Sequence, residues 1–115
     1  MKKSLSKDEI LSTRELKSVF KTGKRLKGRG LGLCFVANRR QSSRFGVSVS
    51  KKYGTAVQRN YAKRIVREVY RLHKDKLQAC CDMVFVVYPH PMVFASAHDA
   101  VIGLMEKACM IKKVG

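Results

Sequence analysis

Residues 47–70 read Val-Ser-Val-Ser-Lys-Lys-Tyr-Gly-Thr-Ala-Val-Gln-Arg-Asn-Tyr-Ala-Lys-Arg-Ile-Val-Arg-Glu-Val-Tyr and predict the end of a strand, a glycine turn and a helix. At about 100° per residue, this helix should have an apolar half and a basic half. The predicted apolar half contains Val57, Ala62, Ile65, Val66, Val69 and Leu72. The predicted basic half contains Arg59, Asn60, Lys63, Arg64, Arg67, Arg71 and Lys74.

The basic half of this helix has almost no acidic counterpart, because only Glu68 interrupts it. Cations in such a row repel one another unless a polyanion neutralises them, so the sequence favours a nucleic-acid partner. The alternative is an ordinary solvated helix face, which usually mixes both signs of charge.

The composition of the whole chain agrees with a polyanionic partner. The chain has 115 residues and a formal net charge of +17, at which sequence-independent attraction to phosphates dominates binding. This length predicts one RNA-binding domain over residues 1–115, with residues 1–11 as a basic and mobile amino-terminal segment. No run of about 18 apolar residues and no signal-peptide pattern is present, so we expect a cytoplasmic protein without a membrane partner.

The four cysteines do not follow a metal-binding pattern. Cys34, Cys80, Cys81 and Cys109 lack Cys-x-x-Cys spacing, and adjacent cysteines are poorly placed to share one zinc ion or one disulfide. We expect reduced thiols. No internal repeat or Gly/Ser/Pro linker divides the chain.

The residues before the basic helix predict one helix and two or three strands. Ser12 and Glu15 fit a capping box, Leu16, Val19 and Phe20 form the stripe of a short helix, and Gly23 is a candidate C-cap. From 26 to 37 the apolar pattern has period two, which predicts strand. A second alternating run at 44–50 predicts another strand, paired antiparallel with the first through the loop 38–43.

The residues after the basic helix predict one buried strand and a last helix. The helix should end between 73 and 77, and the continuous apolar run 83–88 is typical of a strand buried on both faces. Residues 92–110 carry the stripe of an amphipathic helix: Phe94, Ala97, Val101, Leu104, Met105 and Ala108. The expected order is α-β-β-β-α-β-α, or the same order with one strand fewer.

The sequence does not favour a self-sufficient nuclease. Phosphodiester cleavage by protein usually needs clustered carboxylates to hold metal ions, or a positioned acid and base. The eight acidic residues are scattered, and His73, His90 and His98 lie in separate contexts, although a His/Lys/His arrangement stays open. We therefore expect a binding protein without catalytic residues or a bound metal.

The kind of nucleic acid follows from the strand that precedes the helix. The chain lacks helix-turn-helix, zinc-finger and RRM signatures. A basic stripe beside a strand face of serine, glycine and small apolar residues favours structured RNA over DNA. Phe20 is a candidate stacking platform for a splayed single strand, with a role in the core as the alternative.

The segment from Ser48 to Arg64 resembles the signature of the bacterial ribonuclease P protein subunit. That signature has a Val-Ser-Lys-Lys strand end, Gly-Asn-Ala-Val, and then Arg-Asn-Arg-x-Lys-Arg on a helix. The similarity extends from about Leu5 to Cys109 and includes Val19-Phe20-Lys21-Thr22-Gly23.

The resemblance implies a fold. It is an α+β, two-layer sandwich of a roughly four-stranded mixed sheet and three helices, with a left-handed βαβ crossover through the basic helix. General rules of chain topology would instead give a right-handed crossover.

The resemblance also implies a function. In this family the protein assists a catalytic RNA in removing the 5′ leader of precursor tRNA, and the enzyme's Mg²⁺ is held by the RNA. The implied RNA-contacting residues are Lys51, Lys52, Arg59, Asn60, Lys63, Arg64, Arg67 and Arg71. The implied leader cleft contains Phe20, Cys34, Val36, Ser48 and Ser50.

Several positions depart from the family pattern. Thr55 replaces an asparagine, and Tyr61 replaces the second arginine of the motif. Leu16 stands where the family often has a cleft aromatic, and Cys34 where a strand aromatic is common. A ribosomal or other structural RNA-binding protein would have the same composition, and it remains the alternative.

Overall fold

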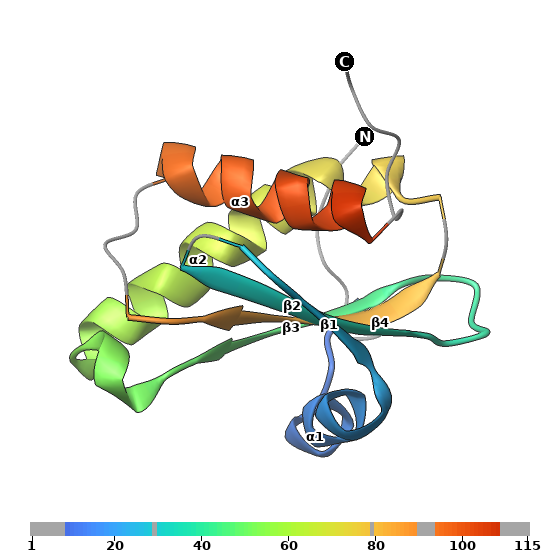
Figure 1. Cartoon of the computed structure of the whole chain (residues 1–115), viewed down its shortest axis with the longest axis horizontal. Helices are drawn as coiled ribbons and strands as arrows, with labels where there is room; N and C mark the ends of the chain where they lie inside the picture. Colours follow the sequence, from blue (N-terminus) through green and yellow to red (C-terminus); the bar gives the residue numbers. More distant parts are fainter. Residues whose placement is uncertain (1–8, 29, 79, 90–93, 109–115) are drawn as a thin grey trace.

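The computed structural model describes residues 9–28, 30–78, 80–89 and 94–108 (Figure 1). The order of helices and strands is α-β-β-β-α-β-α, as predicted. The helices are α1 (Thr13–Thr22), α2 (Ala56–His73) and α3 (Phe94–Lys107), with short 3-10 helices η2 (Lys51–Tyr53) and η3 (Lys74–Lys76) at the ends of α2. The strands are β1 (Lys24–Lys27), β2 (Leu31–Ala37), β3 (Arg44–Val49) and β4 (Cys81–Val87).

The predicted single strand over 26–37 is wrong in its extent, because the chain folds there into the β1–β2 hairpin. The backbone N–H of Gly28 donates to the carbonyl of Leu31 at 2.7 Å, and Gly30 has a φ of 70°. That positive φ is a conformation that glycine adopts at little cost.

The four strands form one sheet in the order β1-β2-β4-β3. β2 is antiparallel to both β1 and β4, whereas β3 is parallel to β4. The predicted antiparallel pairing of the strands on either side of the loop 38–43 is therefore wrong, because β4 lies between β2 and β3. The apolar run of β4 is buried on both faces, and only the inside of a sheet covers a strand in this way.

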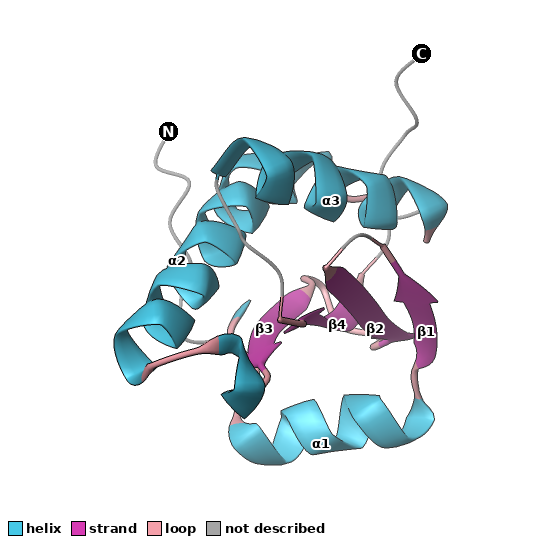
Figure 2. Cartoon of the chain, turned by 60° about the vertical axis from the view of Figure 1, so that its left-hand side comes forward, coloured by secondary structure: helices cyan, strands magenta, loops and turns pink. Residues whose placement is uncertain are grey.

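The β3–α2–β4 unit connects two neighbouring parallel strands. In Figure 2 the chain passes from β3 over α2 to β4 in the left-handed sense, as the family resemblance implies. About 98% of such crossovers are right-handed, so general topology alone would give the wrong hand.

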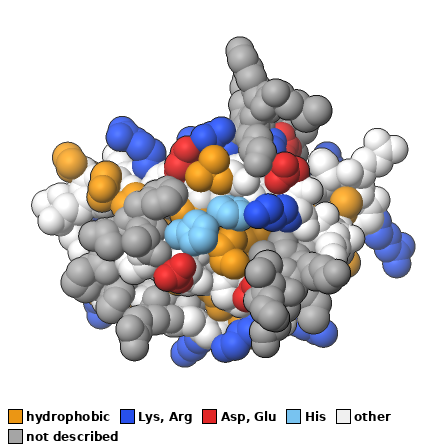
Figure 3. Space-filling view, turned by 90° about the horizontal axis from the view of Figure 1, so that it is seen from above, with side chains coloured by type: hydrophobic (Ala, Val, Ile, Leu, Met, Phe, Trp, Pro, Cys, Tyr) orange, Lys and Arg blue, Asp and Glu red, His pale blue; other side chains and the backbone are white. Residues whose placement is uncertain are grey.

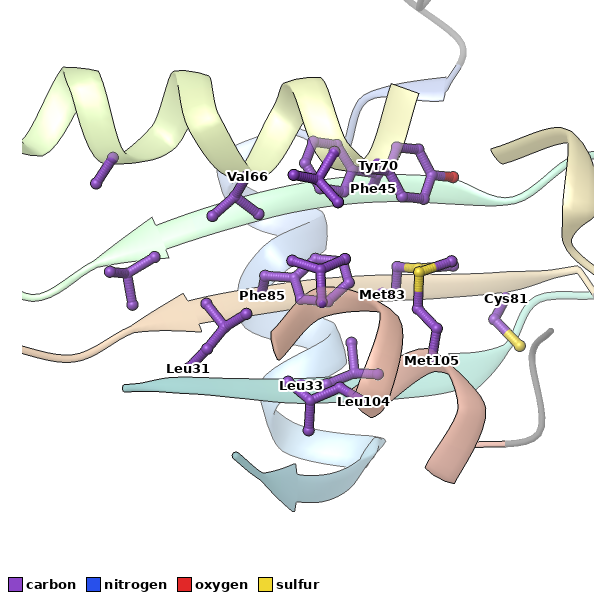
Figure 4. Packing of buried hydrophobic residues seen from close by; sticks show 14 residues of the cluster. Leu31, Leu33, Phe45, Val66, Tyr70, Cys81, Met83, Phe85, Leu104 and Met105 are labelled. Atoms are coloured by element: carbon purple, nitrogen blue, oxygen red, sulfur yellow. The ribbon is translucent and has the colours of Figure 1, made fainter. Parts of the chain in front are cut away.

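Helices cover both faces of the sheet. α2 and α3 pack on one face and form the expected two-layer sandwich with it, while α1 crosses the opposite face (Figures 1 and 2). The larger core lies under α2 and α3, where Phe45 stacks on Tyr70 with ring centroids 4.2 Å apart (Figure 4). The predicted apolar residues Val101, Leu104 and Met105 of α3 belong to this core, and Ala97 is also buried. The side chain of Phe94 lies outside the described residues.

The smaller core lies under α1. It contains the buried residues Leu11, Val19, Cys34 and Val84, with Leu16 and Phe20 packed against them. The predicted capping box is confirmed, since the backbone N–H of Ser12 donates to Glu15 and that of Glu15 donates to Ser12. The predicted stripe of α1 therefore faces the sheet.

A charged cluster ties α1 to the sheet. Arg44 donates to both carboxylate oxygens of Asp82, at 2.8 and 2.6 Å, and also pairs with Glu15 of α1. Asn38 donates to the same carboxylate of Asp82 at 2.9 Å. Burial raises the pKa of Asp82, but these donors outweigh burial and hold that pKa below its ordinary value.

Candidate nucleic-acid interface

The start of α2 is fixed by two caps. Ser50 Oγ accepts from the backbone N–H of Lys52 and begins η2, which carries the exposed Lys51 and Lys52. Thr55 forms a second capping box with Gln58: its hydroxyl accepts from the N–H of Gln58 at 3.2 Å, and its own N–H donates to the Gln58 amide at 2.8 Å. Thr55, a departure from the family pattern, thus retains the hydrogen-bonding ability that an N-cap requires.

Four predicted RNA-contacting residues share the solvent face of α2. Asn60, Lys63, Arg64 and Arg67 are all exposed. These side chains recur every three or four residues along about two turns, so they lie above one another on the helix. Together they form what we call the cationic face.

Arg59 and Arg71 differ from the other predicted contacts. Arg59 is half-buried and donates to the carbonyl of Gly54 at 3.3 Å. Arg71 forms an ion pair with Glu68. The hydrogen bond from the Arg71 guanidinium holds the pKa of the Glu68 carboxyl below its ordinary value. Both arginines therefore already have partners within the protein, which reduces what each can gain from a phosphate.

Val57 does not belong to the buried side of α2, in contrast to the prediction. Its side chain is 78% exposed, and the ring of Tyr61, one turn later, is 55% exposed. Nine residues at about 100° each place Val57 opposite the buried Val66. Ala62, Ile65, Val66 and Val69 are buried as predicted.

Lys63 and Arg67 reach toward the edge of the sheet. With Ile10, Leu16 and Gly46 they line a hollow of about 160 Å³ beside β3. Leu16 packs so closely over Gly46 that a Cβ there would lie 2.4 Å from Leu16 Cδ2. Two residues of the cationic face of α2 therefore share a hollow with Leu16, which lies near the start of α1.

A second hollow lies at the other end of α1. It has a volume of about 180 Å³, and the predicted cleft residues Phe20 and Cys34 both line it. Phe20 also packs on the core under α1, so the alternative of a role in the core is confirmed. Its role as a stacking platform stays a prediction. The Cys34 thiol donates to the carbonyl of Val19 at 3.2 Å and is buried, which raises its pKa.

The other predicted cleft residues are not among those that line this hollow. Val36 packs in the core under α1. Ser48 lies beside Val86 in the β3–β4 register, so it continues the same sheet face beyond the hollow. Ser50 caps η2 with its hydroxyl.

The sequence-based prediction missed the cationic and aromatic side chains of the hollow. Arg25 and Lys27 come from β1, and Tyr88 follows the end of β4. The Arg25 guanidinium lies 6.0 Å from the centroid of the Phe20 ring and donates to the Phe20 carbonyl at 2.9 Å. Gly32 leaves room for Tyr88, because a Cβ at Gly32 would lie 3.3 Å from that ring.

The histidines are closer together than the sequence suggested. His73 and His98 meet edge to face at the α2–α3 contact, with centroids 4.9 Å apart (Figure 3). His73 Nδ1 lies 2.9 Å from the carbonyl of Val69 and therefore donates to it, and His98 Nδ1 lies 3.3 Å from Asp99. His90 lies outside the described residues.

The residues that the structure describes contain no group of three or more His, Cys, Asp or Glu placed to hold a metal ion. Cys34, Cys80 and Cys81 are free thiols, and Cys109 lies outside the described residues. No helix among the described segments is long and apolar enough to cross a membrane. The predicted amino-terminal segment 1–11 also lies mostly outside the described residues, apart from 9–11.

Solved structures share this arrangement of helices and strands. A ribonuclease P protein from Staphylococcus aureus, a mutant with defective mRNA degradation activity, superposes with a TM-score of 0.84 at 24% identity, covering 91% of this chain and 92% of that one. The ribonuclease P protein from Thermotoga maritima gives 0.77 at 28% identity, covering 86% and 96%. These likenesses support the fold, including the three helices and the four-stranded mixed sheet.

Proteins with similar sequences are also ribonuclease P protein components. The ribonuclease P protein component of Clostridium botulinum strain Loch Maree is 36% identical over 107 residues, covering 90% of this chain and 96% of the relative. That of Desulfotalea psychrophila is 41% identical over 75 residues, covering 65% of this chain and 62% of the relative. The family model for ribonuclease P matches residues 5–109. Since that model matches nearly the whole chain and a relative above 30% identity aligns along 90% of it, the chain belongs to the ribonuclease P protein family.

Proposed function

We propose that this protein binds the catalytic RNA of ribonuclease P and the 5′ leader of precursor tRNA, and so assists removal of the leader. The observation that carries the proposal is the cationic face of α2. Its exposed cations stand on a rigid capped helix, and Glu68 on the neighbouring flank is already paired with Arg71. Such a face attracts phosphates without requiring a particular base sequence.

The hollow beside Phe20 is suited to a single strand. It combines an aromatic ring, a guanidinium over that ring, and the half-exposed ring of Tyr88. Bases without a pairing partner stack on such rings, while cations hold the connecting phosphates. This is the combination that a single-stranded leader requires and that a duplex cannot use.

We assign the cleavage reaction to the catalytic RNA. The family resemblance implies Mg²⁺ held by the catalytic RNA, and the described residues offer no carboxylate cluster for a metal. The protein would contribute affinity and positioning. It is then a subunit of an endoribonuclease without catalytic residues of its own.

The proposal is tested by the RNA that the protein captures in its own cell. Tagged protein expressed at its native level should retain the ribonuclease P RNA and precursor tRNA after a wash that removes ribosomes. The matched control replaces Lys63, Arg64 and Arg67 with alanine, which should release the ribonuclease P RNA. Retention of ribosomal RNA instead would favour the alternative of a structural RNA-binding protein.

A further inference from the structure

Val57 and Tyr61 form an exposed apolar strip along one flank of α2. They stand four residues apart, so their side chains lie above one another, and their exposed fractions are 78% and 55%. Neither reaches the core that Val66 and Val69 fill on the other side of the helix. This apolar surface is therefore available to a partner.

The strip borders the cationic face directly. Arg64 stands three residues after Tyr61, so a cation lies beside the exposed ring on the side away from the core. A lipid surface or an apolar protein would have to desolvate these charges. A nucleotide satisfies both sides, because its base presents an apolar face and its phosphate carries the negative charge.

We infer that Tyr61 stacks on an unpaired nucleobase of the RNA that the cationic face binds, with Val57 packing against the edge of that base. The inference rests on the proposed function and adds a contact with a base to contacts with phosphates. The grooves of a paired helix cannot supply this partner, because its bases are stacked on one another and the grooves expose base edges, ribose and phosphate but no base face. A bulged or looped nucleotide exposes the face that Tyr61 needs.

If Tyr61 stacks on a base, its contribution to the affinity for RNA can be measured separately from that of the charged residues. Replacing Tyr61 with alanine removes the ring and no charge, so affinity for the RNA should fall about tenfold while its dependence on salt stays unchanged. Tyr61→Phe keeps the ring and should retain the affinity. The exposure of Tyr61 means that neither change should lower the thermal unfolding midpoint.

The chain contains no tryptophan, so Tyr61→Trp places a single indole at the proposed contact, and its fluorescence can be excited separately from that of the tyrosines. The RNA probes are the ribonuclease P RNA from the same genome and two hairpins that differ by one bulged adenosine. Quenching of the indole at position 61 by the ribonuclease P RNA and by the bulged hairpin, but not by the paired one, is the expected result. The matched control is Gln78→Trp, an exposed position beyond η3, which should not be quenched.

Three other outcomes would each be decisive. Unchanged affinity of Tyr61→Ala together with an unquenched indole would overturn the inference and leave the proposed function intact. Absence of binding between the native protein and the ribonuclease P RNA would overturn the proposed function itself. Dimerisation of RNA-free protein in sedimentation, abolished by Tyr61→Ala, would show that the strip joins two copies of the chain and would also overturn the inference.

Discussion

Gly23 joins α1 to β1 where two backbones leave no room for a side chain. A Cβ there would lie 2.7 Å from the carbonyl oxygen of Val19 and 2.8 Å from that of Phe35. The φ of Gly23 is −82°, which any residue adopts, so the requirement for glycine is steric. The sequence marked this glycine as a helix cap, but only the structure shows which neighbours exclude a side chain.

We expect Gly23→Ala to destabilise the protein by about 1–3 kcal/mol, as overpacking does, because backbone must move to accept the methyl group. Gly103 in α3 provides the matched control, since nothing lies within 4 Å of a Cβ built there. Gly103→Ala should be neutral or stabilising by up to about 1 kcal/mol, because alanine favours helix. Urea denaturation of both variants measures the two effects, and equal losses would contradict the steric explanation.

Asp82 makes the stability of the protein depend on pH in the acidic range. Its folded pKa lies below its ordinary value because Arg44 and Asn38 donate to the carboxylate. Such a group contributes stability above its unfolded pKa of about 3.9, and this contribution is lost as the pH falls through the folded pKa. The native protein should therefore lose stability below about pH 4.

Asp82→Asn should remove that part of the acid sensitivity and lower the stability at neutral pH. Breaking a buried ion pair costs about 3–5 kcal/mol, and the lower end is expected because Arg44 keeps Glu15 as a partner. Thermal unfolding between pH 2.5 and 7 measures both effects. Asp99→Asn is the control, because the side chain of Asp99 is 87% exposed, and it should leave the profile unchanged.

At the scale of elements, the cationic face of α2 should bind RNA by neutralising phosphates, which releases the counterions condensed on the RNA. Arg64 is exposed, so Arg64→Ala should reduce the slope of log K against log salt by about 0.7–0.9, the loss of one phosphate contact. Lys107→Ala removes one exposed charge from α3 and is the control for net charge. Filter binding to the ribonuclease P RNA at several salt concentrations measures the slopes. The same change in slope for both variants would indicate a nonspecific effect of net charge.

The hollow at the end of α1 makes a different prediction. Phe20→Ala and Tyr88→Ala each remove a ring that lines it, and stacking of one base contributes about 1–3 kcal/mol. Binding of precursor tRNA to the assembled enzyme should weaken by that amount, while binding of mature tRNA should not change. Equal losses with both tRNAs would assign these rings to packing alone.

The sequence predicted the elements well wherever the pattern was local. Capping residues placed the start of α1, and the alternating pattern at 44–50 placed β3. The errors came from contacts distant in sequence. No local signal inserts β4 between β2 and β3, brings His73 to His98, or directs Tyr88 over Gly32. Val57 was a different kind of error, since counting residues along the helix already placed it opposite Val66.

At the scale of the whole molecule, the two candidate binding surfaces share one framework. The hollow of Lys63 and Arg67 adjoins Leu16 near the start of α1, and the hollow of Phe20 lies at its end. α1 is fixed between them by the cluster of Arg44, Asp82 and Glu15. If the protein binds the catalytic RNA through α2, as proposed, the hollow proposed to bind the leader would therefore be held in a defined position.

The net charge of +17 leads to the last prediction, which concerns magnesium. An RNA catalyst and an RNA substrate repel each other, and either Mg²⁺ or a basic protein can reduce that repulsion. We expect RNA-free protein to leave precursor tRNA intact, and its addition to the catalytic RNA to restore cleavage at low Mg²⁺, where the RNA alone is nearly inactive. The gain should shrink as Mg²⁺ is raised, because the ions then provide the same screening. Single-turnover cleavage across a Mg²⁺ series measures this. A gain that stayed constant at high Mg²⁺ would instead point to a positioning effect of the protein, and site-specific cleavage by the protein alone would place the chemistry in this chain.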